Sequence, residues 1–182
     1  MKRLFVAIGL PQDVQKKLLD FQRELKSFAK NVKWARVKNI HLTLKFFGNV
    51  EEERISGLAS ALHTISAASF PIHVKGCGFF PDSRRPNVFW AGVMGTGLSP
   101  LQQKVEDVTS QLGFEREKRS FNPHLTLARL RDSRGLQSLV QEAQRQKDVA
   151  LSEFVASHFS LYESILRPQG AQYEVIETVS LS

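Results

Sequence analysis

Apolar residues along this chain follow two spacings, which predict a repeated order of strands and helices. A continuous apolar run over residues 4–10 predicts a buried strand, ended by Pro11. Pro11 suits the first position of the helix that follows. That helix carries its apolar stripe at Val14, Leu18, Phe21, Leu25 and Phe28.

The first half of the chain continues with a strand over about residues 40–47, closed by Gly48-Asn49. A second amphipathic helix and a strand over residues 71–80 follow. The apolar stripe of this helix is Ile55, Leu58, Leu62 and Ile65. A loop over residues 81–86, with two prolines and two arginines, separates these elements from the second half.

The same order begins again with a strand over residues 87–93. A helix starts at Ser99-Pro100 and stops at Gly113, and a strand covers about residues 124–130. Ser133 suits the cap of a fourth helix. The apolar stripes of these two helices are Leu101, Val105, Val108 and Leu112, then Leu136, Leu139, Val140 and Ala143. Strands over residues 151–162 and 173–181, joined by a turn at residues 167–170, finish the chain.

Four residues occur twice, as His41-Leu42-Thr43-Leu44 and as His124-Leu125-Thr126-Leu127. Because side chains alternate along a strand, each copy presents its His and Thr on one face and its leucines on the other. The two histidines are 83 residues apart, since 124 − 41 = 83. The same offset of 83 residues also pairs Gly9 with Gly92, Leu18 with Leu101, and Leu25 with Val108. These matches indicate an internal duplication.

We therefore expect an α+β fold in a single bilobal domain over residues 1–182. The internal repeat covers roughly residues 1–80 and 87–165, and an extra C-terminal strand joins one lobe. Each lobe is expected to be an antiparallel sheet backed by helices, related to the other by a pseudo-two-fold axis. The two motif strands are expected to face each other across a central cleft.

The composition indicates the class of binding partner and the cellular compartment. A net charge of +7 and a pI near 9.8 favour an anionic partner such as nucleic acid, although they also serve solubility. Cys77 is the only cysteine, which excludes an intramolecular disulfide and a Cys-based zinc site. The N-terminal apolar run is too short for a secretion signal, and no run approaches a membrane span. We expect a soluble, cytoplasmic monomer.

Two histidines in one cleft suit acid-base catalysis. One imidazole accepts a proton from the nucleophile while the other donates a proton to the leaving group. Thr43 and Thr126 can hold anionic oxygens by hydrogen bonds. These groups suit in-line displacement at phosphorus. The symmetry of the half-sites leaves open which histidine is the acid.

A metal-dependent mechanism is the main alternative chemistry. Zinc needs three or four ligands, and neither motif has a nearby Asp, Glu or third His. Lys45 and Arg129, close to the motifs, are expected to repel a cation. No P-loop is present in the sequence, so we expect neither metal nor cofactor. A non-catalytic protein that binds RNA ends is the alternative from another class. It would not turn over an excess of a substrate.

The two motifs and their surroundings resemble the two-histidine (2H) phosphoesterases, and most closely their RNA 2′,3′-cyclic phosphodiesterase branch, also called 2′-5′ RNA ligases. The segments that carry the resemblance are residues 3–8, 39–48, 89–93 and 123–129. The resemblance implies a bilobal fold and metal-independent hydrolysis of a 2′,3′-cyclic phosphate, on RNA ends or nucleosides, to a 2′-phosphomonoester. It also implies reversible 2′-5′ ligation, with His41 as proton donor and His124 as proton acceptor.

Phe46 and Arg129 each lie five residues after a motif histidine. Strict alternation places both on the leucine side, as a core Phe and a surface Arg. A bulge or a strand end just after each motif would turn both toward the cleft. There the ring and the guanidinium can sandwich a nucleobase, and we favour this clamp.

Overall fold

The structure, a computed structural model, describes residues 1–29, 32–130, 134–168 and 170–182. Within these ranges the chain forms four α-helices, nine strands and two short 3-10 turns. In chain order these are β1 (Lys2–Gly9), α1 (Gln12–Lys26), β2 (Lys33–Trp34), η1 (Val37–Asn39), β3 (His41–Val50), η2 (Glu52–Arg54), α2 (Ile55–His63), β4 (Phe70–Phe80), β5 (Val88–Met94), α3 (Leu98–Gln111), β6 (His124–Arg129), α4 (Gln137–Arg145), β7 (Ala150–Ala156), β8 (His158–Arg167) and β9 (Gly170–Ser180).

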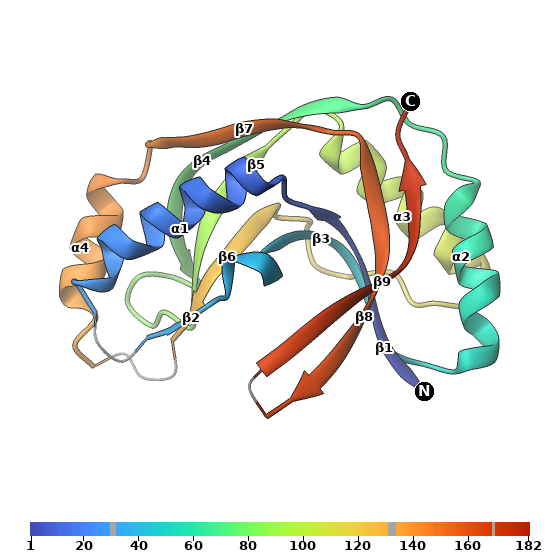
Figure 1. The fold of residues 1–182 in the computed structure, drawn as a ribbon, viewed down its shortest axis with the longest axis horizontal. Helices are drawn as coiled ribbons and strands as arrows, with labels where there is room; N and C mark the ends of the chain where they lie inside the picture. Colours follow the sequence, from blue (N-terminus) through green and yellow to red (C-terminus); the bar gives the residue numbers. More distant parts are fainter. Residues whose placement is uncertain (30–31, 131–133, 169) are drawn as a thin grey trace.

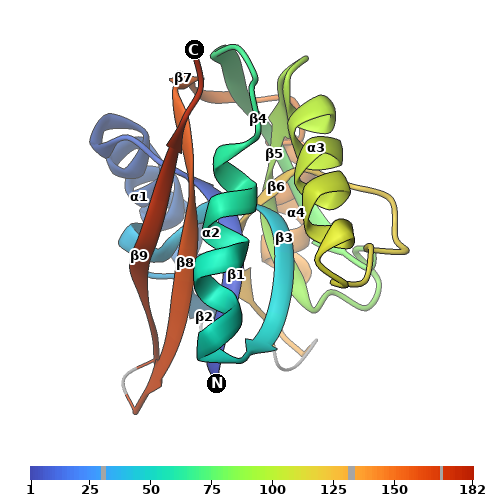
Figure 2. The ribbon, with the colours of Figure 1, turned by 90° about the vertical axis from the view of Figure 1, so that its right-hand side faces the viewer.

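One curled antiparallel sheet holds these strands in the order β7-β4-β5-β6-β3-β1-β8-β9, and β2 pairs with β6. The sheet forms an arch, with α1 and α4 over one half and α2 and α3 over the other (Figure 1). Figure 2 shows α2 and α3 side by side. No helix in the described ranges is long and apolar enough to cross a membrane.

The predicted helices form close to their expected bounds. In α1 the stripe residues Val14, Leu18, Phe21 and Leu25 are buried, and Pro11 is the cap rather than the first helical residue. The third helix begins at Leu98, because Gly97 and not Ser99 precedes its first turn. The fourth helix begins at Gln137. Its expected cap, Ser133, lies outside the described residues.

The α+β class, with antiparallel strands backed by helices, is confirmed. The two expected sheets are, however, a single sheet, because Leu42 of β3 pairs with Leu125 of β6. The motif strands are therefore neighbours rather than facing each other across a gap. The third strand of each sequence half also joins the other half: β4 pairs with β5, and β8 pairs with β1. The internal repeat itself stays a prediction.

The strand expected over residues 151–162 is divided in two at Ser157. On one side of the break β7 pairs with β4, and on the other side β8 pairs with β1. These partners belong to opposite halves of the sheet, so the chain crosses the arch here. The hydrophobic pattern is continuous across the break because both segments are strands. It therefore carries no sign of the change of partner.

A buried ion pair lies beneath the first motif. The Lys45 Nζ is 2.5 Å from Glu106 Oε2 and donates a hydrogen bond to the Glu115 carbonyl at 2.7 Å. Gln102 holds the second Glu106 oxygen at 3.2 Å. The Lys45 and Glu106 side chains are only 3% and 6% exposed. Glu106 therefore neutralises the charge of Lys45 next to the motif, and the repulsion of a cation by Lys45 stays a prediction.

Lys45→Met should destabilise the fold by about 3–5 kcal/mol, because it leaves Glu106 charged and unpaired in the interior. The double variant Lys45→Met/Glu106→Met should recover most of this loss, because no charge is then stranded. Urea unfolding measures both. Lys2→Met is the matched control, because its 2.8 Å pair with Glu163 lies nearer the surface. Equal losses in the single and double variants would contradict the prediction.

Candidate active site

The pairing of the two motif strands brings the four predicted polar side chains together. Leu42 lies opposite Leu125 in an antiparallel pair, and both are buried. One step along the strands in either direction places His41 beside Thr126 and Thr43 beside His124. Paired residues share a face and neighbours alternate, so these four lie on the face away from the leucines. We call His41, Thr43, His124 and Thr126 the motif patch.

Both motif strands contain an irregularity at the same place. The pairing of β3 with β1 skips Leu44, and the pairing of β6 with β5 skips Leu127. One extra residue in one strand of an antiparallel pair is a β-bulge, which shifts the alternation of the residues after it. The bulge expected after each motif is thus present in both halves. As a result the residue after each bulge, Lys45 or Ala128, is buried like the skipped leucine.

Phe46 lies beyond the first bulge and is 63% exposed. It pairs with Phe5 of β1, so the two side chains share a face. The Phe5 ring contacts Phe46 at a centroid distance of 5.6 Å and stacks on the His41 ring at 4.6 Å. Phe46 is therefore on the motif face, next to the surroundings of His41.

Arg129 lies beyond the second bulge and is exposed. It pairs with Val88 of β5, two residues before Trp90, which pairs with Thr126. Alternation along β5 puts Val88 and Trp90 on one face, so Arg129 shares the face of Thr126. Both expected clamp residues thus lie on the side of the sheet that carries the motif patch.

Each motif histidine is oriented by a backbone carbonyl two residues before it. The Nδ1 of His41 is 2.8 Å from the Asn39 oxygen, and the Nδ1 of His124 is 2.7 Å from the Asn122 oxygen. A carbonyl oxygen only accepts, so Nδ1 carries the hydrogen in each ring and Nε2 is available to a substrate. The sequence reasoning missed both asparagines, although they share the 83-residue offset.

Aromatic rings surround the two histidines unequally. His41 stacks on Phe5, and the edge of its ring meets Tyr173 at 5.1 Å. Tyr162 stacks on the Phe5 ring at 5.2 Å. His124 contacts Phe80 edge-on at 4.9 Å. None of these aromatic residues was predicted as part of the site, because the strand pairs that bring them to the histidines are distant in sequence.

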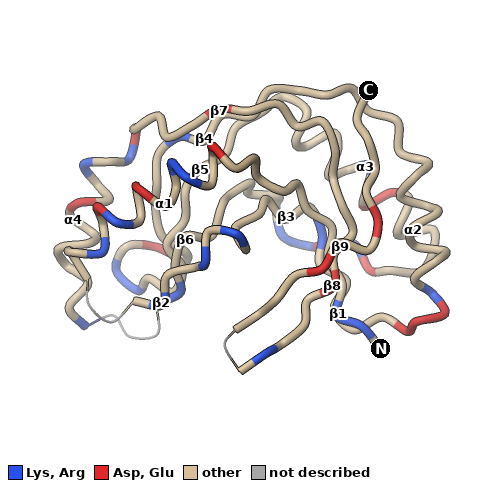
Figure 3. The backbone as a smooth tube through the Cα atoms, viewed as in Figure 1, with Lys and Arg blue, Asp and Glu red and all other residues tan. Residues whose placement is uncertain are grey.

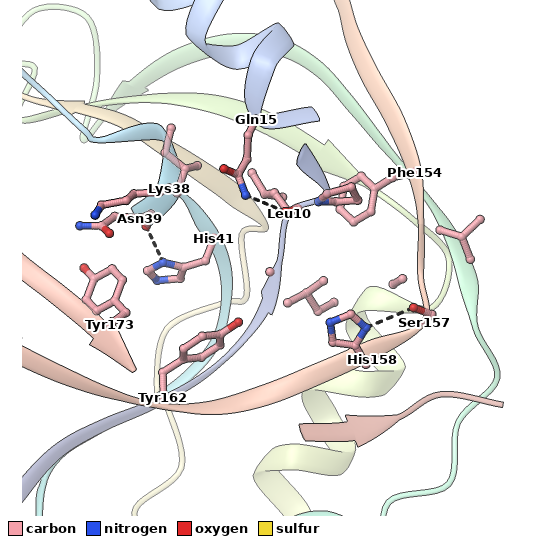
Figure 4. A pocket seen from close by; sticks show the side chains of 16 residues that line it. Leu10, Gln15, Lys38, Asn39, His41, Phe154, Ser157, His158, Tyr162 and Tyr173 are labelled. Carbon is pink, nitrogen blue, oxygen red and sulfur yellow. Dashed lines mark hydrogen bonds between the residues drawn. The ribbon is translucent and has the colours of Figure 1, made fainter. Parts of the chain in front are cut away.

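Two cavities adjoin the motif patch. One, of about 450 Å³, is lined by His41, Tyr162 and Tyr173 together with Lys38 and His158 (Figure 4). The other, of about 1000 Å³, is lined by two further patch residues, Thr43 and His124, and by Phe46. Its basic lining residues are Lys45, Arg54, Arg116, Lys118 and Arg119. Thr126 and Arg129 are on the motif face but line neither cavity.

Charge on the surface is broadly distributed, with Lys and Arg over both halves of the molecule (Figure 3). Several cations around the larger cavity already have partners. Arg116 is 2.6 Å from Asp107, and Arg119 is 3.0 Å from Glu117. The basic character of this cavity is therefore partly neutralised by its own side chains.

The pKa of the His41 side chain differs from that of a free histidine. Burial lowers its pKa to about 4, helped by repulsion from the nearby His124, while the Asn39 carbonyl opposes the shift. In the substrate-free protein His41 is thus neutral at neutral pH. A negatively charged group bound beside it would raise this pKa, because an opposite charge favours the protonated form.

Other candidate groups lie apart from the motif patch. Cys77 is buried, and burial raises the pKa of its thiol to about 12, so it is a packed residue rather than a nucleophile. His63 lies beside Glu177 and His73 beside Glu153. In the part of the chain that the structure describes, no group of three His, Cys, Asp or Glu is placed to hold a metal ion.

Comparison with known proteins relates this site to others. Residues 8–90 and 94–173 match the family described as LigT like Phosphoesterase. The RNA 2′,3′-cyclic phosphodiesterase of Methanocaldococcus jannaschii is 34% identical over 175 residues, covering 96% of this chain and 98% of that protein. The crystal structure of TT0787 of Thermus thermophilus is similar with a TM-score of 0.81 and 27% identity, over 98% of this chain and 97% of that one. E. coli LigT, crystallised with 3′-AMP, is similar with a TM-score of 0.77 and 22% identity, over 100% and 98%.

The lowered pKa of His41 predicts how stability depends on pH. The unfolded chain takes up this proton near pH 6.5 and the folded protein only near pH 4, so folding stability is lost as pH falls between these values. His41→Gln should remove that part of the loss. Urea unfolding of both proteins at pH 7, 5.5 and 4.5 measures the difference. Identical pH dependence in the two proteins would show that His41 titrates normally.

Proposed function

This chain belongs to the LigT-like phosphoesterase family, and from that membership we propose that it hydrolyses 2′,3′-cyclic phosphodiester ends of RNA to 2′-phosphomonoesters without a metal ion. The observation that carries the proposal is the motif patch, in which two histidines and two threonines share one face of adjoining strands. Relatives named RNA 2′,3′-cyclic phosphodiesterase, such as that of M. jannaschii, support the substrate class.

In the proposed reaction His124 removes a proton from a water molecule as its oxygen attacks phosphorus. The bond from phosphorus to the ribose 3′-oxygen breaks, and His41 donates a proton to that oxygen. The products are a 2′-phosphate and a 3′-hydroxyl. The hydroxyls of Thr43 and Thr126 donate hydrogen bonds to the two non-bridging oxygens from opposite sides, where negative charge develops.

The proposed roles require His41 to carry a proton when the substrate is bound. Its pKa of about 4 in the substrate-free protein means that His41 takes up this proton from solvent when the phosphate binds. The anionic phosphate raises the pKa of His41, whereas uptake before binding is opposed by burial. The assignment of donor and acceptor follows the family resemblance, since both rings present Nε2 in the same way.

We propose that Phe46 and Arg129 bind the base next to the cyclic phosphate. Both are exposed on the motif face, one beyond each bulge. A ring and a planar guanidinium can stack on any base, so this contact adds affinity without sequence selection. E. coli LigT was crystallised with 3′-AMP, which supports a site that accepts a single nucleotide.

The same displacement with an RNA 5′-hydroxyl in place of water gives 2′-5′ ligation: the 5′-oxygen attacks phosphorus, the bond to the 3′-oxygen breaks, and a 2′-5′ phosphodiester remains. One chain supplies both histidines and both threonines, so the reaction needs no second copy, and we infer a monomer. We place the protein in the cytoplasm, in keeping with its single buried cysteine. Its partners are RNA ends and nucleoside cyclic phosphates. A protein that only binds RNA ends would use the same face but would not convert a substrate to product.

An oligonucleotide with a terminal 2′,3′-cyclic phosphate, in excess over protein, should be turned over in the presence of EDTA and yield a 2′-phosphate. His41→Ala and His124→Ala should each lower the rate by on the order of 10²–10⁴ without unfolding the protein. Phosphorus NMR of the product identifies the surviving ester, and His73→Ala is a matched control, because His73 lies beside Glu153 and lines neither cavity. A 3′-phosphate would place the acid on the other oxygen. Loss of activity in EDTA would favour a metal site, and absence of turnover would favour a binding protein.

Phe46→Ala and Arg129→Ala should each weaken binding of a nucleoside 2′-phosphate by roughly 1–3 kcal/mol, by similar factors for all four bases. Phe46→Tyr should keep most of the affinity because the ring remains. Calorimetric titration with the four nucleotides measures these changes. A loss confined to one base, or none in either variant, would contradict the clamp.

A further inference from the structure

The two halves of the motif patch share a backbone plan but have different surroundings. Each histidine is held at Nδ1 by an asparagine carbonyl, and each motif strand has its bulge at the second leucine. β9 lies outside the predicted repeat and adds to the half that holds His41. The β8–β9 hairpin projects from the arch on this side (Figure 1).

Tyr173 of β9 packs against the first histidine. Its ring meets His41 edge-on at 5.1 Å and Phe5 at 5.0 Å. Phe5 in turn stacks on both His41 and Tyr162 of β8, at 4.6 Å and 5.2 Å, and the His41 and Tyr162 rings are themselves 6.4 Å apart. The His41 ring thus lies among three aromatic rings. Two of them, Tyr162 and Tyr173, are supplied by the hairpin (Figure 4).

Asn39 links the hairpin to the orientation of His41. Its side-chain Nδ2 donates a hydrogen bond to the Ala171 carbonyl of β9 at 2.7 Å, while its own carbonyl accepts from His41 Nδ1. The equivalent Asn122 differs, because its side chain donates to the nearby Ser120 carbonyl at 3.2 Å. Asn39 therefore connects His41 to the hairpin by hydrogen bonds, whereas Asn122 connects His124 only to its own loop.

In the described residues, no hairpin packs against His124 in the way that the β8–β9 hairpin packs against His41. The edge strand of its half, β7, pairs with β4 only over Phe70–Lys75. Phe80, the aromatic neighbour of His124, lies at the far end of β4, beyond that pairing. β9, in contrast, pairs with β8 along its whole length from His158 to Arg167.

We propose that the β8–β9 hairpin, through Tyr173 and Asn39, is the element that makes the two motif histidines chemically unequal, with Tyr173 and Asn39 acting as positioning residues for His41. The inference rests on the proposed function for its meaning, since a two-histidine reaction needs one donor and one acceptor. A symmetric patch supplies two equal imidazoles. The added strand breaks this symmetry by packing the Tyr173 ring against only one of them.

The ionisable groups around His41 come from several elements. They are His124 on β6, His158, Tyr162 and Tyr173 on the hairpin, and Lys38 on η1. Burial raises the pKa of Tyr162, so its phenol is neutral at neutral pH. No carboxylate lines this cavity in the described residues, so burial governs the pKa of His41.

The test is the titration of both motif histidines by NMR in the substrate-free protein, independent of any activity. In Tyr173→Leu and in Asn39→Ala, the pKa of His41 should rise from about 4 toward the ordinary value near 6.5. Tyr173→Phe keeps the ring and should titrate as the wild type. Asn122→Ala, the matched control, should leave the His41 pKa in place.

Turnover of a cyclic-phosphate substrate adds a second measurement. Tyr173→Leu should lower kcat with little change in KM, because the threonines still hold the phosphate, and Tyr173→Phe should restore kcat. An unchanged His41 pKa in both Tyr173→Leu and Asn39→Ala would overturn the proposal. So would an equal response to Asn39→Ala and Asn122→Ala. If the wild type lacks turnover but the titrations differ as expected, the proposed function fails and the role of the hairpin stands.

Discussion

The site depends on the register of one strand pair. Leu42 lies opposite Leu125, and that pair fixes which side chains of the two motifs share a face. A slip of one residue in either strand would turn a histidine and a threonine into the core and two leucines toward the motif face. All four motif leucines are buried, so hydrophobic burial holds the register that catalysis needs. The same burial therefore stabilises the fold and positions the polar groups.

The two β-bulges are the second feature on which the site depends. They add Phe46 and Arg129 to the motif face and bury the residue before each of them. In the second half the buried residue is Ala128, which needs no partner. In the first half it is Lys45, whose charge requires Glu106 and the Glu115 carbonyl. A common backbone thus supports halves with different interiors and, around the histidines, different surroundings.

Much of this arrangement could be predicted from the sequence. Hydrophobic spacing located the helices, and the duplicated motif predicted the polar face and the internal offset. Periodicity does not report strand partners, so the exchange of β4 and β8 between halves and the break at Ser157 were missed. For the same reason Tyr173 and Phe80, distant in sequence from the histidines they contact, were not expected at the site. Asn39 and Asn122 could have been found from the offset.

The most direct test of the two-histidine account uses a 2′,3′-cyclic phosphate in which sulfur replaces the 3′ bridging oxygen. A thiolate departs without being protonated, so this substrate needs no general acid. If His41 is the acid and His124 the base, His41→Ala turns it over at close to the wild-type rate, while His124→Ala stays as impaired as on the oxygen substrate. Recovery in His124→Ala instead would reverse the two roles. Recovery in neither variant would contradict acid-base catalysis by this pair.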